Sequence, residues 1–244
     1  MLNGRRIVVT GASSGIGRGL ARAFSSAGAR VWGVGRDPGA LEETARDHPG
    51  MLAVSADLTT ASGRNAVATA IDHRGGRLDV IVHAAGLLGA PGVTLDAYPE
   101  PEWRDVIDIN LTAVHLLHQE LIAALERGTV PTVIALASTV GRIPRQGWGA
   151  YAVSKHALEG WVALLALEWQ HGRVYSVNPG GTRTPMRSIA VPTEDPTTVP
   201  TPADIAPLFL RLAHPRAPEP SGAILDARDW IGRDPWDGIV TAAS

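Results

Sequence analysis

The stretch RIVVTGASSGIG, residues 6–17, decides the fold. Its first five residues are a short apolar run typical of a buried strand, and three glycines follow where a helix is predicted over 15–27. Gly11 permits a tight turn, Gly15 lets backbone approach a pyrophosphate, and Gly17 allows close packing of helix on strand. Free N–H groups at the helix N-terminus favour phosphate. The stretch therefore predicts a nucleotide-binding strand–turn–helix unit.

The same alternation of strand and helix continues along the chain. Further strands are predicted at 30–34, 51–55, 78–83, 130–137, 173–177 and 223–226, and further helices after Pro38 and at 101–127, 150–170 and 203–213. Strands that are apolar on both faces and alternate with helices indicate a parallel sheet covered by helices on each side. The class is therefore α/β, with a doubly wound parallel sheet of about seven strands.

One segment does not follow this alternation of strands and helices. Residues 182–202 (TRTPMRSIAVPTEDPTTVPTP) hold five prolines and many threonines. Long irregular segments in compact domains are often lids or binding loops. We expect this segment to be a substrate lid.

Composition excludes several classes of function. The chain has 244 residues, a formal charge of −2 and no cysteine. It therefore offers no basic surface for nucleic acid, no polybasic membrane patch and no thiolate metal site. No apolar run approaches the ~18 residues of a membrane span, and the N-terminus has no signal-peptide pattern. We expect a cytoplasmic protein without a metal, a nucleic-acid partner or a membrane contact.

The end of the second predicted strand bears on the choice of nucleotide. NAD sites place an acidic side chain there to bind the ribose hydroxyls, whereas this chain has Gly35 followed by Arg36. A guanidinium binds a 2′-phosphate that a carboxylate would repel, and Ser13 and Ser14 can add hydrogen bonds. Asp37 is expected to cap the helix that begins at Pro38, although a shift of one residue would aim it at the ribose. NADP(H) is favoured and NAD(H) stays open.

The stretch YAVSK, residues 151–155, contains the only lysine of the chain; every other basic side chain is arginine. Tyr151 and Lys155 are four residues apart on a predicted helix, so they share a face. A neighbouring ammonium lowers the pKa of a phenol, and lysine and arginine are not interchangeable in such a site. Ser138 ends the fifth predicted strand at the edge where open α/β sheets bind ligands. Asn110 falls inside the long predicted helix.

These motifs together resemble the short-chain dehydrogenase/reductase family. TGASSGIG matches its TGxxxGxG, YAVSK its YxxxK and NPGGTRT (178–184) its PGxxxT, in the expected order. The resemblance implies a single Rossmann-type domain over 1–244. By the same resemblance, Tyr151 is the general acid, Lys155 activates it and binds ribose, and Ser138 polarises the carbonyl. Asn110 holds a relay water, and Thr184 contacts the pyrophosphate and nicotinamide region.

The resemblance also implies a set of cofactor contacts and a homodimer or homotetramer. Besides Tyr151 and Lys155, the expected contacts are Gly11, Ser13, Ser14, Gly15, Ile16, Gly17, Arg36, Asp57, Leu58, Ala84, Ala85, Gly86, Pro179, Gly180, Thr182 and Thr184. Asp57, just after the third predicted strand, is placed to accept from the adenine amino group. Trp148, Met186 and Ile189 are candidate substrate contacts.

Two departures from the family pattern stand out. His83 in HAAG occupies a position where the family usually has asparagine, and we expect a structural role for it. The C-terminal LDARDWIGRDPWDG (225–238) lacks the usual DGG beside the substrate pocket.

Three functions remain open. The first is an NADPH-dependent reductase of ketones or aldehydes, in which Tyr151 protonates the oxygen. The second is an NAD-dependent alcohol or sugar dehydrogenase, and the third is a nucleotide-sensing regulator without turnover. The acid–base set of Ser138, Tyr151, Lys155 and Asn110 argues against the third, because a sensor does not need it.

Overall fold

The computed structural model describes residues 1–239, so positions 240–244 of the predicted domain lie outside the described residues. Seven parallel strands form one sheet in the order β3-β2-β1-β4-β5-β6-β7. The strands are β1 Arg6–Thr10, β2 Arg30–Gly35, β3 Met51–Ser55, β4 Val80–His83, β5 Thr132–Leu136, β6 Arg173–Asn178 and β7 Ile224–Asp226. The predicted doubly wound parallel sheet is confirmed.

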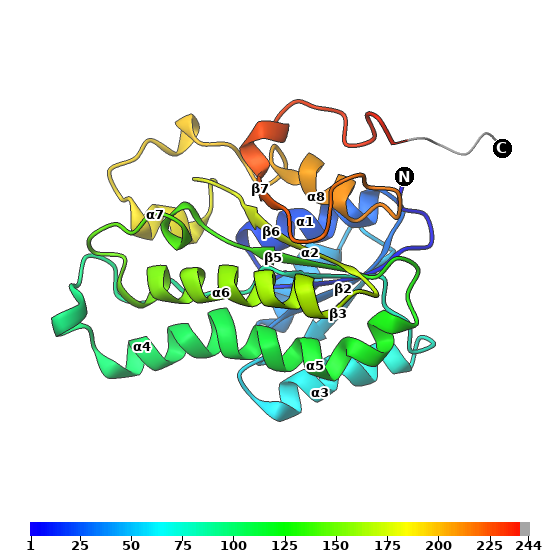
Figure 1. The fold of residues 1–244 in the computed structure, drawn as a ribbon, viewed down its shortest axis with the longest axis horizontal. Helices are drawn as coiled ribbons and strands as arrows, with labels where there is room; N and C mark the ends of the chain where they lie inside the picture. Colours follow the sequence, from blue (N-terminus) through cyan, green and yellow to red (C-terminus); the bar gives the residue numbers. More distant parts are fainter. Residues whose placement is uncertain (240–244) are drawn as a thin grey trace.

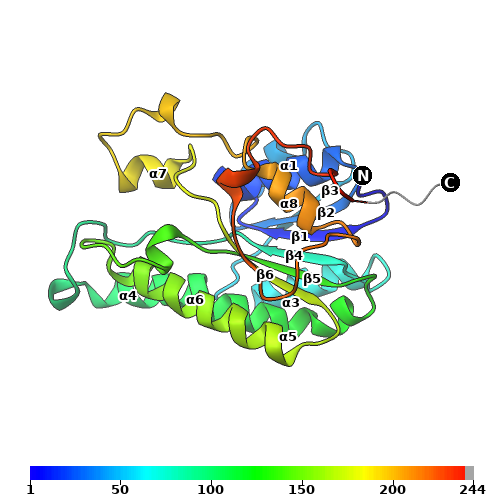
Figure 2. The same ribbon diagram turned by 45° about the horizontal axis from the view of Figure 1, so that its top comes forward.

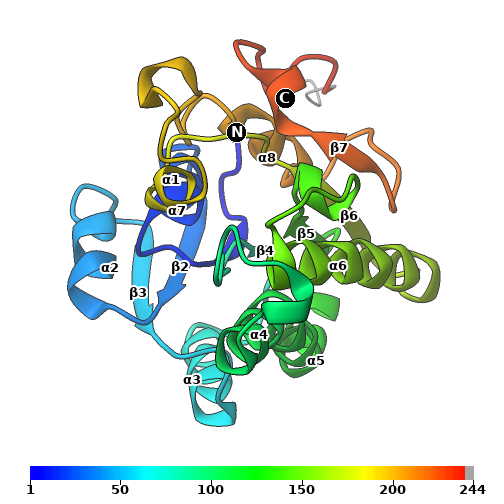
Figure 3. The same ribbon diagram turned by 90° about the vertical axis from the view of Figure 1, so that its left-hand side faces the viewer.

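The sheet is covered by helices on both faces, as Figures 1 and 2 show. The helices are α1 Gly15–Ser26, α2 Pro38–Ala45, α3 Ala61–Asp72, α4 Glu100–Ile107, α5 Ala113–Glu126, α6 Gly149–Glu168, α7 Pro185–Ala190 and α8 Ala206–Leu212. In Figure 3, α1 and α8 lie on one side of the strands, and α3, α5 and α6 lie on the other. Each face of the sheet has its own hydrophobic core. Phe24 of α1 and Phe209 of α8 belong to one core, and Leu117 of α5 and Leu158 of α6 belong to the other.

The strand order sets the position of the site. The chain runs from β1 outward to β3 and then returns to β4 beside β1, where Ile7 pairs with Val80. Loops after β1 and β4 therefore diverge to opposite faces of the sheet. A crevice at such a switch point, outside the carboxyl ends of the strands, is where open α/β sheets bind ligands.

The long helix predicted over 101–127 is not one regular helix. A π-helical turn, Asp108–Thr112, separates α4 from α5. Turns of this type are rare and frequently lie at functional sites. The turn contains Asn110, the residue that the sequence singled out.

The segment 182–202 is more ordered than its prolines predict. It contains α7 and a 3₁₀ turn, Pro196–Thr198. The guanidinium of Arg187 forms a two-point ion pair with Glu194, with both N–O distances 2.6 Å. Arg183 donates to the carbonyls of Pro196 and Val199. Figure 2 shows α7 projecting past the end of the sheet.

No helix within residues 1–239 combines the length and the apolar character that a membrane span requires.

Candidate functional site

The glycine turn after β1 is built as the sequence predicts. Gly11 has a φ of +69°, and a Cβ there would come within 2.9 Å of the backbone of Ala85. A Cβ on Gly17 would meet the carbonyl oxygen of Gly11 at 2.3 Å. Any side chain at either position would therefore disrupt the turn. The hydroxyl of Thr10 accepts from the N–H groups of Ala84 and Ala85, both at 3.0 Å, and so fixes the start of the loop after β4.

A cavity of about 410 Å³ opens over this turn. Glycine backbone, the ends of β2 and β3 and the start of α6 form its walls. Sixteen of the predicted cofactor contacts line it: Gly11, Ser13, Ser14, Gly15, Ile16, Gly17, Arg36, Asp57, Leu58, Ala84, Ala85, Gly86, Tyr151, Lys155, Pro179 and Thr184. Thr184 closes the cavity against the turn, because its Cγ2 would lie 3.3 Å from a Cβ on Gly15.

Three charged residues that follow β2 and β3, namely Arg36, Asp37 and Asp57, differ in their hydrogen-bond and ion-pair partners. Asp37 caps α2, because its carboxylate accepts from the N–H of Ala40 at 3.0 Å. The guanidinium of Arg36 lines the cavity and forms no ion pair with any of residues 1–239. Asp57 accepts from the N–H and the hydroxyl of Thr59, and these bonds lower its pKa. The cap expected of Asp37 is confirmed. Arg36 is a positive charge available to a ligand in a cavity that Asp57, Asp105 and Asp108 also line, and its charge helps to lower the pKa of Asp57.

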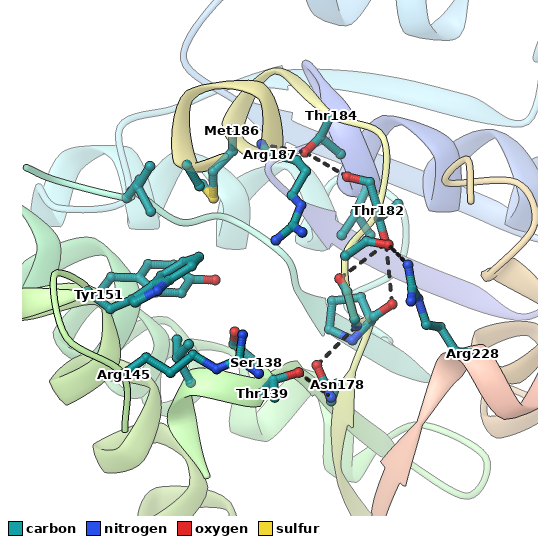
Figure 4. Close-up of a pocket in the computed structure, with 18 of the residues that line it drawn as sticks. Ser138, Thr139, Arg145, Tyr151, Asn178, Thr182, Thr184, Met186, Arg187 and Arg228 are labelled. Carbon is teal, nitrogen blue, oxygen red and sulfur yellow. Dashed lines mark hydrogen bonds between the residues drawn. The ribbon is translucent and has the colours of Figure 1, made fainter. Parts of the chain in front are cut away.

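A second cavity, of about 360 Å³, adjoins the first (Figure 4). The two share Ile16, Tyr151, Pro179, Thr184 and Met186 as lining residues. Ser138 and Trp148 also line the second cavity. A small molecule there would therefore touch Ser138 and Tyr151 while a ligand in the first cavity lay beside it. A volume of this size suits a small organic substrate.

Tyr151 lies on α6 between the two cavities, and the ring of Trp148 lies 5.8 Å from it. Burial raises the pKa of Tyr151, and the hydroxyl of Ser138 opposes that shift. The direction is opposite to the lowering expected from the neighbouring ammonium. At neutral pH the phenol therefore keeps its proton, which suits it to donate one.

Lys155 is buried, with 5% of its surface exposed, and lies on the same face of α6 as Tyr151. Its Nζ is 5.7 Å from the centre of the Tyr151 ring and donates to the carbonyl of Leu136 at 2.6 Å. Burial lowers the pKa of Lys155 to about 8, and Glu159 partly opposes this. The ammonium is thus held by a backbone carbonyl at the end of β5, and burial rather than its charge sets the direction in which the pKa of Tyr151 shifts.

Asn110 is buried at the π-helical turn and lines neither cavity. Its side chain accepts from the N–H of Leu87 at 2.8 Å and donates to the carbonyl of Leu87 at 3.0 Å. It also donates to the hydroxyl of Ser154, on α6, at 2.9 Å. Asn110 therefore ties the loop after β4 to the helix that carries Tyr151 and Lys155.

Other predicted residues lie elsewhere than expected. Gly180 and Thr182 line the second cavity rather than the first. Ile189 is 62% exposed and lines neither cavity, whereas its neighbour Ala190 does. The expected substrate contact of Ile189 therefore has no support in the structure, because the turn of α7 points it outward.

The structure also adds residues that the sequence did not indicate. Three arginines, Arg145, Arg187 and Arg228, line the second cavity together with Asp226. A single arginine outside any motif carries no pattern that the sequence would reveal. Arg228 had one signal, because it lies where the C-terminal segment departs from the family motif.

His83 lies at the end of β4 and is buried, in edge contact with Trp161 at 6.0 Å. Burial lowers the pKa of His83 to about 3, helped by the nearby charges of His118 and Lys155. It lines neither cavity, which agrees with a structural role. Residues 1–239 contain no group of three or more His, Cys, Asp or Glu side chains suited to a metal ion.

Comparison with known proteins matches this chain to oxidoreductases of one family. A family model described as short chain dehydrogenase matches residues 5–195. An uncharacterized oxidoreductase, YciK of Escherichia coli K12, is 41% identical over 246 residues, which is 96% of this chain and 95% of that protein.

Solved structures that are similar to this chain belong to the same family. One from Shigella flexneri 2a, provisionally assigned as a short chain dehydrogenase and complexed with NADP, is 40% identical with a TM-score of 0.87; the match covers 93% of this chain and 98% of that one. Another with the same provisional assignment, from E. coli CFT073 and complexed with NADPH, is 39% identical, with the same TM-score and coverage. The likeness therefore extends over nearly the whole chain.

Proposed function

The chain belongs to the short chain dehydrogenase family of oxidoreductases, and from that premise we propose that it is an NADP(H)-dependent reductase of ketones or aldehydes. The observation that carries the proposal is the position of Tyr151, half-buried between the two cavities, where burial raises the pKa of its phenol. One cavity suits a dinucleotide and the other suits a carbonyl compound.

The fit to NADP(H) rests on the first cavity. The turn at Gly11 and Gly17 has no room for a Cβ, and it presents backbone to the position of a pyrophosphate. Arg36 lines the cavity without an ion-pair partner among the described residues, while Asp37 is engaged as a helix cap. A free guanidinium favours a 2′-phosphate. The NADP and NADPH bound to the two similar structures support the same choice.

Each residue of the acid–base set then has a role. When bound, the reduced nicotinamide supplies the hydride. Ser138 donates a hydrogen bond to the carbonyl oxygen, and Tyr151 transfers its phenolic proton to that oxygen. Lys155 holds a positive charge beside Tyr151 and donates to the cofactor ribose. Asn110 fixes the loop after β4 against α6, and so holds a wall of the first cavity beside the helix that carries Tyr151 and Lys155.

Two features complete the proposal. The segment 182–202 serves as a lid, with Met186 of α7 facing both cavities. A closed lid would exclude water from the transfer step. The active protein is a homodimer or homotetramer.

The test is an assay of purified protein with a panel of ketones and aldehydes, using NADPH and NADH in parallel. Tyr151→Phe is the control, because it removes the proton donor and keeps the ring. We expect NADPH oxidation in the parent and its near loss in the variant. Reaction with NADH alone, or only in the direction of alcohol oxidation, would favour the dehydrogenase. Cofactor binding without any turnover would favour a regulator.

A further inference from the structure

The second cavity carries more positive charge than reduction of a neutral carbonyl requires. Its charged lining residues are Arg145, Arg187, Arg228 and Asp226. Figure 4 shows Arg145 on the side of Tyr151, Arg228 on the opposite side and Arg187 between them. Three guanidinium groups thus surround the space into which the Tyr151 hydroxyl points.

Two of the four charges are already paired. Asp226 forms an ion pair with Arg142 at 3.1 Å and accepts from the side-chain amide of Asn178 at 2.6 Å. Arg187 is bound at two points by Glu194, which uses both of its carboxylate oxygens. The charge of Arg187 is therefore engaged, whereas Asp226 shares Arg142 with Glu159, which lies 2.8 Å from that guanidinium, and so keeps part of its negative charge at the cavity.

Arg145 and Arg228 are not paired in this way. Among the residues that the structure describes, neither forms an ion pair, and the guanidinium of Arg228 donates to the carbonyl of Gly181. The charge of Arg228 also adds to the Arg187 hydrogen bond that lowers the pKa of Glu194. Arg145 lies three residues before Trp148, in the loop that leads into α6. Two guanidiniums therefore reach the cavity with hydrogen-bond donors left over.

Two glycines that line the cavity lie directly against the side chains of Arg228 and Arg187. Gly180 has a φ of +66°, and a Cβ there would lie 2.8 Å from Cδ of Arg228. A Cβ on Gly181 would lie 3.2 Å from Cζ of Arg187. Two consecutive glycines thus let arginine side chains lie directly against the backbone. The orientation of Arg228 follows from packing rather than from chance exposure.

We propose that the substrate is a carbonyl compound that carries a carboxylate, whose negative charge is attracted by Arg145 and Arg228 on the two sides of the cavity while its carbonyl lies at Ser138 and Tyr151. The proposal rests on the proposed carbonyl reductase and specifies its substrate class. A guanidinium matches a carboxylate with two parallel N–H···O bonds, stronger than bonds between neutral groups. Arg145 and Arg228 are both exposed residues, so solvent and salt screen their attraction for the carboxylate.

The experiment compares matched substrates that differ in charge. The probes are methyl ketones with two to four methylene groups between ketone and carboxylate, such as 5-oxohexanoate, and their methyl esters. We expect kcat/KM for the best acid to exceed that for its ester at least tenfold. Arg145→Gln and Arg228→Gln should each lower the acid-to-ester ratio at least threefold, and the double variant at least tenfold.

Arg46→Gln is the matched control, since Arg46 is an exposed arginine that lines neither cavity. It should retain the ratio of the parent. Esters reduced as well as acids at every chain length, or a ratio unchanged in the double variant, would overturn the proposal while leaving the carbonyl reductase intact.

A binding measurement separates the two proposals. Acids and esters are titrated by calorimetry into the Tyr151→Phe protein, with and without NADP⁺. Acids that bind more tightly than esters through the two arginines, with no ketone reduced by the parent, would sustain the carboxylate site and refute the reductase. Neither binding nor turnover of any probe would overturn both.

Discussion

We expect His83 to set a large part of the acid sensitivity of this protein. It is 2% exposed at the end of β4, and its Nε2 has no hydrogen-bond partner among the described residues. The groups around it are the Trp161 ring, His118 and the Lys155 ammonium, so within residues 1–239 no neighbouring carboxylate stabilises an imidazolium. In the folded protein His83 therefore stays neutral well into the acid range.

The size of this loss of stability in acid follows from the lowered pKa of His83. Burial lowers the pKa of His83 from 6.5 in the unfolded chain to about 3 in the folded protein. Between these values the unfolded chain binds a proton that the folded protein does not, so stability is lost as pH falls from about 6.5. From pH 7 to pH 5 this amounts to about 2 kcal/mol for one histidine. His118, whose pKa is lowered to about 4 chiefly by burial, adds a similar loss.

The assay is urea unfolding at pH 7 and pH 5, with the free energy extrapolated to water. Between these pH values His83→Leu should lose about 2 kcal/mol less than the parent, whatever the substitution costs in packing. His73→Gln, at an exposed histidine on the end of α3, is the control and should behave as the parent does. A His83→Leu protein that loses as much stability as the parent would refute the reasoning.

Three further predictions concern the site. Lys155→Arg should leave the protein folded and lower kcat/KM at least a hundredfold, because a planar guanidinium does not fit the buried position of an ammonium 2.6 Å from the Leu136 carbonyl; near-parental activity would refute this. Arg36→Ala should raise the KM for NADPH about ten- to hundredfold more than that for NADH, since a charge-assisted bond to phosphate contributes about 1.5–3 kcal/mol. Equal KM values for the two cofactors in the parent would contradict it. Limited proteolysis should cut the free protein within 182–202, and NADP(H) with a substrate analogue should protect it; equal resistance in both states would mean that this segment does not gate the site.

Much of the fold could be predicted from the sequence because its signals are local. Apolar runs bounded by glycines predicted most strand ends to within two residues. The turn at Gly11 and Gly17 was predicted because neither position has room for a side chain. The cap at Asp37 was also local, because Pro38 defines the first turn of α2. Each of these features depends on residues close together in the chain.

Features that depend on tertiary packing were harder to predict. The π-helical turn at Asn110 forms where its side chain bonds to Leu87 and Ser154, both far away in sequence. The raised pKa of Tyr151 results from burial by several elements, and no sequence spacing reports it. Arg145 lies in a loop and Arg228 in a 3₁₀ turn 83 residues further on, and only the fold brings them to one cavity.

The most direct test of the central claim follows the hydride itself. NADPH carrying deuterium at both C4 positions is mixed with the best carbonyl substrate, and the product is analysed by mass spectrometry and NMR. We expect one deuterium on the new carbinol carbon in the parent reaction, and almost no labelled product with Tyr151→Phe. A carbinol without deuterium, or NADPH consumption without a carbinol, would contradict hydride transfer with Tyr151 as proton donor.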